Sequence, residues 1–337
     1  MNDWLARLLL GPGWGVVSQL LPCPLEAGWT IQRDIALPAP GGGYSAIQAE
    51  SGGSRFWLLS DLPEGELSRW TLPLSDSPPR RAEALRLQVP VELTQQLDGE
   101  GLVIDGDQAW VTSEGRSSDE RPALLLRFSL TSGALLQAMP LPRLWQPGAQ
   151  QGLNSNAGPE GLARLSRMGQ PLALLMAAEH PLRQDPSSQI RLLRWHWPDK
   201  SDGRSVPPQA SEQGALEAPA DGPWGLTDLL VLHPQQPGPP VLLTLWRRYR
   251  EPLQWSNQLR LYRLPEPGQV MPALHQWDLQ ADGLTPENWE GISLAPAVSS
   301  EPPGFLLVSD DNLNPLQRSR LALLKPNRMA SCPRHQP

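Results

Sequence analysis

The stretch Glu100-Gly-Leu-Val-Ile104 is followed, after a short turn, by Ala109-Trp-Val-Thr-Ser-Glu114. An acid and a glycine open a short apolar run, and a second apolar run ends on a charged residue. Short apolar runs bounded by turn residues are typical of buried β-strands. The phrase recurs along the chain, and its other copies open at Gly43, Glu160, Asp228 and Glu290.

The copies are evenly spaced. With Gly43, Gly101, Gly161, Asp228 and Gly291 as markers, successive copies are 58, 60, 67 and 63 residues apart. Four antiparallel strands per repeat, arranged radially, are the pattern of a β-propeller. The sequence therefore predicts an all-β fold, a single β-propeller of about five four-stranded blades, and leaves a sixth blade open. Further alternating runs that supply third and fourth strands are 124–130, 135–141, 190–197, 258–264 and 320–324.

The two ends of the chain are expected to meet. The last copy ends after its third strand, and the segment from Trp29 to Leu37 is suited to supply the fourth. We expect a propeller domain over 29–326, a weakly structured N-terminal extension over 1–28 and a C-terminal tail over 327–337. Residues 198–223 are rich in Pro, Ser, Gly and Asp and predict an exposed loop insertion.

Composition excludes several classes of partner. The 337 residues carry 28 basic and 35 acidic side chains, a net charge of −7, so we expect no nucleic-acid partner. No apolar run is long enough for a membrane-spanning helix, and residues 1–21 lack a convincing signal-peptide pattern. Cys23 and Cys332 could meet in a closed ring, but two separate thiols are favoured over a disulfide.

Acidic residues stand at the ends of the predicted strands. In an antiparallel pair, the start of the first strand and the end of the second lie at the same edge. These acids should therefore gather around one mouth of the central channel, where crowded carboxylates either take up protons or hold cations. The alternative is structural, since such acids can also accept backbone N–H groups of the adjacent blade. The acids concerned are Asp61, Glu100, Glu114, Glu160, Glu179, Asp228, Glu290 and Asp310.

Common catalytic motifs are missing. The sequence has no G-x-S-x-G elbow, no phosphate-binding G-x-x-x-x-G-K-[ST] loop and no H-E-x-x-H pair. Its five histidines show no metal-ligand spacing, and only His180 stands at the predicted mouth. The tryptophans at 57, 110 and 195 fall on strand positions, which favours a place in the core.

One stretch near the C-terminus is specific for a known family. Asn288-Trp-Glu-Gly-Ile-Ser-Leu294 is followed by Leu307-Val-Ser-Asp-Asp-Asn312 and by Gln317-Arg-Ser-Arg-Leu321. Over about residues 38–326 the chain resembles the phytase-like family, known for the esterase-like activity of phytase. The resemblance implies a propeller, hydrolysis of phosphate or other esters, and a periplasmic or secreted location. Where this family usually has an acid before the arginine of the fourth repeat, this chain has Trp246, which removes one expected carboxylate.

These observations lead to two hypotheses. In the first, the protein is a metal-assisted hydrolase of small esters and uses a divalent cation, Ca²⁺ in preference to Mg²⁺. In the second, it is a non-catalytic propeller that binds a ligand or protein at the same mouth. A monomer is expected in either case. In the first hypothesis, Glu160, Glu290, Asp310 and Asp311 hold the metal, Glu114, Glu179 and Arg318 are catalytic, and Arg116, Asn156, Arg247 and Asn312 bind substrate.

Overall fold

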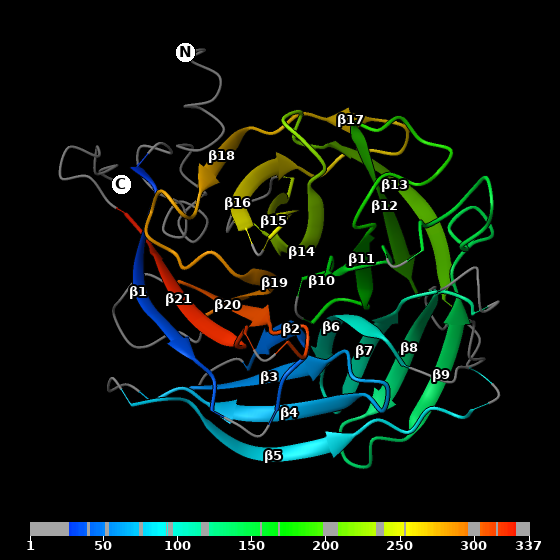
Figure 1. Cartoon of the computed structure of the whole chain (residues 1–337). Coiled ribbons are helices and arrows are strands. Elements are labelled where there is room, and N and C mark those ends of the chain that lie inside the picture. The colour runs from blue at the N-terminus through cyan, green and yellow to red at the C-terminus, as the bar shows by residue number, and fades with distance from the viewer. Residues whose placement is uncertain are drawn as a thin grey trace.

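The computed structural model confirms the propeller and fixes the number of blades at five (Figure 1). All regular elements among the described residues are β-strands, and none of these residues forms a helix that could span a membrane. The described residues are 27–38, 41–50, 54–73, 77–91, 93, 97–115, 121–155, 157–167, 169–197, 208–233, 239–252, 254–295, 304–314 and 316–327. Cys23 and Cys332 lie outside them.

The first two blades are four-stranded antiparallel sheets, each built from consecutive strands. Blade 1 contains β2 (Tyr44–Ala49), β3 (Arg55–Ser60), β4 (Glu66–Thr71) and β5 (Arg80–Arg86). Blade 2 contains β6 (Gly99–Asp105), β7 (Gln108–Ser113), β8 (Leu124–Ser129) and β9 (Leu135–Pro140).

Blade 3 has an additional edge strand. It contains β10 (Gly161–Arg164), β11 (Ala173–Ala177), β12 (Gln189–His196) and β13 (Gln209–Glu217), and β17 (Val270–Met271) pairs parallel with β13. The prediction of an exposed loop over 198–223 was wrong for this part of the segment. Residues 209–217 form β13, in which Ala215 and Leu216 are buried. The first residues of this strand are polar and partly exposed, which is why the sequence resembled a loop there.

The last two blades show how the ring closes. Blade 4 contains β14 (Gly225–Leu232), β15 (Val241–Arg250), β16 (Gln254–Arg263) and β18 (His275–Asp278). Blade 5 contains β19 (Asn288–Leu294), β20 (Phe305–Asp310) and β21 (Arg320–Pro326), and its fourth strand is β1 (Trp29–Ala36). The predicted closure is thus confirmed, with Trp29 opposite Pro326 and Ala36 opposite Arg320.

The hydrophobic core lies between neighbouring blades. One cluster joins blades 2, 3 and 4, and three others join blades 4 and 5, blades 1 and 2, and blades 5 and 1. Trp57, Trp110 and Trp195 are all buried, as their strand positions predicted. A fully buried large apolar side chain contributes roughly 1.5–3 kcal/mol, so these clusters hold the blades in a fixed ring.

The inner strands surround the channel and touch one another in the order β2, β6, β10, β14 and β19, with β19 returning to β2. Glycines permit this close approach. A side chain at Gly101 would meet the carbonyl oxygen of Glu160 at 2.6 Å, and one at Gly291 would meet the amide nitrogen of Ile47 at 2.8 Å. The recurring acid–glycine pair therefore places an acid where two inner strands come together.

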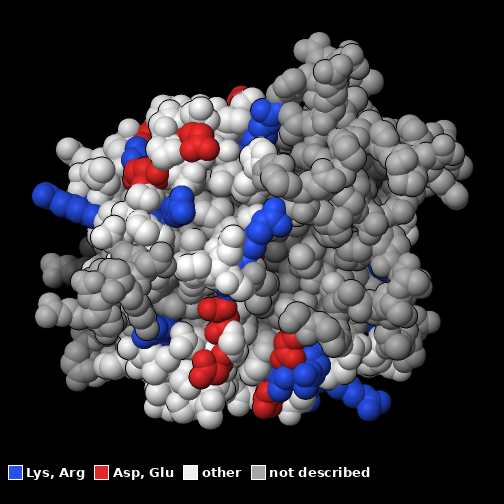
Figure 2. All heavy atoms as spheres, turned by 180° about the vertical axis from the view of Figure 1, so that it is seen from behind, with Lys and Arg blue, Asp and Glu red and all other residues white. Residues whose placement is uncertain are grey.

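Charged side chains on the outer surface are mixed in sign. On the face drawn in Figure 2, the described Lys and Arg residues are interspersed with Asp and Glu. This distribution agrees with a sequence in which acidic residues outnumber basic ones, 35 to 28.

Candidate active site at the channel mouth

Strand pairing brings the predicted acids to one edge, which we call the channel mouth. Asn288 at the start of β19 lies opposite Asp310 at the end of β20, and Gly225 lies opposite Arg247 in the same way. The prediction that strand starts and strand ends meet at one mouth is confirmed for these blades.

A register shift marks the start of the inner strand in four blades. It falls at Ser45, at Glu100 and Gly101, at Thr227, and at Glu290. An extra residue in one strand of a pair redirects a side chain, here at the mouth. The shifts also correct the predicted alignment, because Ser45 and Thr227 are the counterparts of Glu100 and Glu290.

Asp228 is therefore not one of the mouth acids. Its Oδ1 accepts the N–H of Leu229 at 2.8 Å and its Oδ2 accepts the N–H of Ile292 on β19 at 2.8 Å. Burial raises its pKa to about 8, while the backbone N–H groups of Ile292, Leu229 and Leu162 act in the opposite direction. The structural role considered for such acids is realised here, where a carboxylate joins neighbouring blades.

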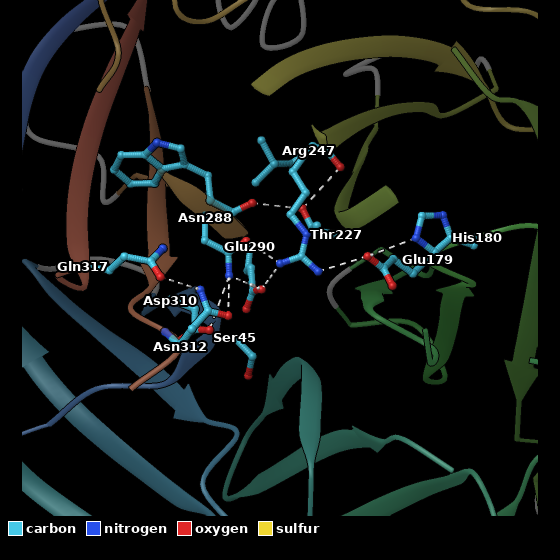
Figure 3. A network of polar contacts seen from close by, with 12 residues as sticks. Ser45, Glu179, His180, Thr227, Arg247, Asn288, Glu290, Asp310, Asn312 and Gln317 are labelled. Atoms are coloured by element: carbon cyan, nitrogen blue, oxygen red, sulfur yellow. Dashed lines mark hydrogen bonds and ion pairs between the residues drawn. The ribbon is translucent and has the colours of Figure 1, made fainter. Parts of the chain in front are cut away.

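Arg247 is the centre of the mouth (Figure 3). Its Nη2 lies 3.0 Å from Oε1 of Glu179, and its Nη1 pairs with Oε1 of Glu290 and donates to Oδ1 of Asn288. Burial alone would disfavour its charge, but Glu290, Glu179 and Glu160 outweigh burial and raise its pKa further. Arg247 takes the position where the other blades have an acid, so it supplies the positive charge that the crowded carboxylates require.

Trp246, the residue before Arg247, does not face the mouth. It is fully buried in the core between blades 3 and 4, and its indole N–H donates to Thr244. Adjacent residues of a strand point to opposite faces, so Trp246 faces away from Arg247. The expectation that Trp246 removes a mouth carboxylate was wrong, because the residue at the mouth is Arg247.

Asn288 was quoted in the family stretch but not predicted as a site residue. It is fully buried, and its Nδ2 donates to Glu290 at 2.8 Å, to Asp310 at 3.3 Å and to Asn312 at 3.4 Å. An amide between acids links them without adding charge. Its position two residues before Glu290 on the same strand was the available signal.

The mouth carboxylates have raised pKa values. Burial raises the pKa of Asp310 to about 6 and that of Asp61 to about 8, and in both cases neighbouring carboxylates add to the shift. Burial and the neighbouring acids also raise the pKa of Glu100 and Glu160. The pKa of Glu290 is raised by burial as well, although Arg247 opposes the shift. Near neutral pH the mouth can therefore hold both ionised and protonated carboxyl groups.

Asp61 and Asp311 lie against the chain at the entrance to blade 1. The N–H of Gly43 donates to Oδ1 of Asp311 at 3.0 Å, and a side chain at Gly43 would meet Oδ1 of Asp61 at 2.2 Å. Gly43 also has a φ of 60°, which glycine adopts without strain. A glycine at this position lets two acids from different blades approach the same stretch of backbone.

The predicted metal ligands do not form a metal site. Among the described residues, no three His, Cys, Asp or Glu side chains are placed to hold an ion. Glu290 is paired with Arg247, and Asp311 accepts the backbone N–H groups of Gly43 and Leu313. Arg247 already neutralises part of the acidic charge, so these residues are not arranged around a divalent cation, and the cation stays a prediction from the sequence.

Of the other predicted site residues, some lie at the mouth and some do not. Glu114 and Glu179 are buried at the mouth, and His180 approaches Glu179 at 3.5 Å. Asn312 is exposed at the rim, and its N–H donates to Oδ1 of Asp310 at 2.9 Å. Arg318 is exposed, and its guanidinium has no hydrogen bond or ion pair with any described residue. Arg116 and Asn156 lie outside the described residues.

An aromatic pair adjoins Arg247. β15 and β16 have 10 residues each, and Tyr249 lies opposite Trp255 near their shared turn. The two rings are 4.6 Å apart, and the Arg247 guanidinium lies 5.9 Å from the Trp255 ring. The mouth thus has an aromatic wall on the blade 4 side, which the sequence prediction missed.

The family model described as "Phytase-like: Esterase-like activity of phytase" matches residues 39–313. The chain belongs to the phytase-like family. Asn288, Glu290 and Asp310, three of the residues that surround Arg247, all lie within the matched region of this phytase-like chain. Among curated protein sequences, none matches it.

Three solved structures that resemble this phytase-like protein are distant from it in sequence. An α-L-arabinanase of Cellvibrio cellulosa is 10% identical with a TM-score of 0.47, over 85% of this chain and 92% of that one. An endo-arabinase of Bacteroides thetaiotaomicron is 9% identical with a TM-score of 0.43, over 91% and 99%. The Cps50 (Swd1) β-propeller domain of Myceliophteria thermophila is 10% identical with a TM-score of 0.39, over 89% and 100%. At these TM-scores none of them informs the function of this chain.

Proposed function

We propose that this protein hydrolyses small uncharged esters at the channel mouth, by general acid–base catalysis between carboxyl groups. The observation that carries the proposal is the group of buried and half-buried acids with raised pKa values at the channel mouth. Carboxyl groups with pKa values shifted toward neutrality are suited to proton transfer at physiological pH. Membership of the phytase-like family, described by its esterase-like activity, supports the hydrolase class.

The roles follow from the pKa directions. With a pKa near 6, Asp310 is largely ionised at pH 7 and serves as the base that takes a proton from water. With a pKa near 8, Asp61 is largely protonated and serves as the acid that gives a proton to the leaving alkoxide. Water adds its hydroxyl to the acyl carbon, the acyl–oxygen bond breaks, and the products are a carboxylic acid and an alcohol.

The remaining groups hold the mouth in place and stabilise charge. Arg247 supplies fixed positive charge, and Asn288 keeps Glu290 and Asp310 at hydrogen-bond distance from one amide. The exposed Asn312, beside Asp310, can donate to the oxygen that becomes negative in the transition state. Tyr249 and Trp255 offer an aromatic surface for an apolar part of the substrate.

Among esters, the charge of the mouth favours an uncharged substrate over a phosphate monoester. Carboxylates outnumber guanidinium groups around Arg247, and like charges raise the free energy of a bound dianion. A bound cation would reverse this preference, which is why the predicted Ca²⁺ and the substrate class are best tested together.

The test is hydrolysis of p-nitrophenyl acetate, p-nitrophenyl phosphate and phytate with Ca²⁺, with Mg²⁺ and with EDTA. We expect turnover of the acetate in EDTA and its loss in Asp310→Asn, with Asp105→Asn as a control in the Arg164 ion pair away from the mouth. Phosphate release that requires Ca²⁺ would instead support the metal-assisted hydrolase. No turnover from folded protein under any condition would favour the non-catalytic binding propeller.

A further inference from the structure

A second polar pocket lies beside the mouth in blade 4. It has a volume of about 200 Å³ and is bordered by β15, β16, β18 and the connection that precedes β14. Arg248 and Ser256 are opposite each other on β15 and β16 and both line it. Because successive residues alternate between the faces of a sheet, the side chains of Arg248 and Ser256 point to the face opposite that of Arg247.

Two glutamines in the pocket are held in a fixed orientation by one arginine. The Nε of Arg260 donates to Oε1 of Gln258 at 2.9 Å, and its Nη2 donates to Oε1 of Gln276 at 2.6 Å. With both oxygens engaged, each Nε2 is a donor that has no hydrogen-bond partner among the described residues. Their orientation is fixed before any ligand arrives, which lowers the entropy cost of binding.

Arg248 adds a fixed positive charge. Its Nη1 donates to the carbonyl oxygen of Asp221 at 2.8 Å and pairs with Oδ2 of the same residue at 3.0 Å. Its Nε is buried and has no partner within the described part of the chain. Asp221 thus holds the Arg248 guanidinium in place at the edge of the pocket.

The lining combines donors, acceptors and an aromatic surface without excess charge. The positive charges of Arg248 and Arg260 are matched by the carboxylates of Asp221 and Asp278. Trp224 lines the same space, with the Arg248 guanidinium 4.5 Å from its ring. Hydroxyl groups both donate and accept, so a compound with several of them fits such a lining better than an anion does.

We propose that this pocket is a second ligand site, which binds one ring of an uncharged polyhydroxylated compound, such as a monosaccharide. Its size agrees, because pockets for drug-sized ligands span about 300–1,000 Å³ and this one is smaller. The site does not depend on the esterase proposed for the mouth, since none of its donors belongs to that chemistry.

The test is ligand-observed NMR and calorimetric titration of the full chain. The probes are the methyl glycosides of glucose, galactose and xylose, with inorganic phosphate and acetate as anions. We expect saturable binding of at least one glycoside and weaker or no binding of either anion. Binding of the anions alone would overturn the proposal in favour of an anion site, and binding of no probe would overturn it as well.

Gln276→Ala is the decisive variant because Gln276 is exposed and its removal leaves the core unchanged. It should weaken glycoside binding by about three- to ten-fold, the range for one hydrogen bond. Gln254→Ala is the matched control, an exposed glutamine on the same blade that does not line the pocket. Ser256→Ala, which removes only a hydroxyl from the lining, is a second variant that should also weaken glycoside binding. Equal affinity in Gln276→Ala and the parent would contradict the site.

Discussion

Replacing Arg247 with methionine should destabilise the protein in a strongly pH-dependent way. The substitution keeps much of the side-chain volume but removes the cation that pairs with Glu179 and Glu290. Both acids are buried, with side chains 6% and 8% exposed. Removing one partner of a buried ion pair typically costs about 3–5 kcal/mol, because the other charge is left without compensation. We expect this loss in the free energy of unfolding at pH 8.

The loss should shrink as the pH falls. Burial raises the pKa of Glu290 and Arg247 opposes that shift, so without Arg247 the folded-state pKa rises further above the unfolded value. The folded variant then binds more protons than the unfolded chain, and its stability decreases as pH rises through this range. At pH 5, where Glu290 can be neutral, the cost should approach that of the lost hydrogen bonds, about 0.5–1.5 kcal/mol each.

The assay is urea unfolding of parent and variant at pH 5, 6.5 and 8. The control is Arg86→Met, which breaks an ion pair whose side chains are 69% and 71% exposed and which should cost less than about 1 kcal/mol at every pH. A penalty for Arg247→Met that is equal at pH 5 and pH 8, or that stays below the control, would refute the electrostatic account of the mouth.

Three further predictions concern activity toward p-nitrophenyl acetate. The value of kcat/KM should rise through about pH 6 as Asp310 ionises and fall above about pH 8 as Asp61 loses its proton, and a rate that climbs steadily to pH 10 would contradict these roles. Asp310→Asn should lower kcat by about 10²–10⁴-fold, and because the amide oxygen keeps only one of the two hydrogen bonds that Asp310 accepts, urea unfolding should show a loss of about 0.5–1.5 kcal/mol. Trp255→Ala should raise KM for aromatic esters more than for acetate esters of aliphatic alcohols, and an equal change for both would exclude the aromatic wall from substrate binding.

The inner strands could be predicted from the sequence because each contains a buried apolar run. The outer strands were harder, since β5 (Arg80–Arg86) is polar along most of its length and exposed on much of its surface. A strand at the rim of a blade packs little apolar surface, so period-two patterning is lost. The same reason explains why β13 was mistaken for part of a loop.

At the mouth, the kinds of residue were predictable and their partners were not. Arg247 lies 43 and 68 residues from Glu290 and Glu179, and only the packing of blades 3, 4 and 5 side by side brings the three together. The register shifts at Ser45 and Thr227 also change which residue faces the channel, and no pattern in the sequence shows them. Asp228 is an example. It stands one residue after Thr227, the residue that occupies the mouth position, and its carboxylate therefore joins neighbouring blades.

The pairing of β1 with β21 also determines when the site can exist during synthesis. β1 is made first and stays without its partner until residues 320–326 have left the ribosome. Pairings this distant in sequence raise the contact order and slow folding. Blade 5 supplies Glu290 and Asp310, so the candidate catalytic group is completed only at the last stage of assembly. Until then Trp29 and Ile31 lack the blade 5 strands that pack against them in the folded protein, and apolar surface that stays exposed during folding favours aggregation.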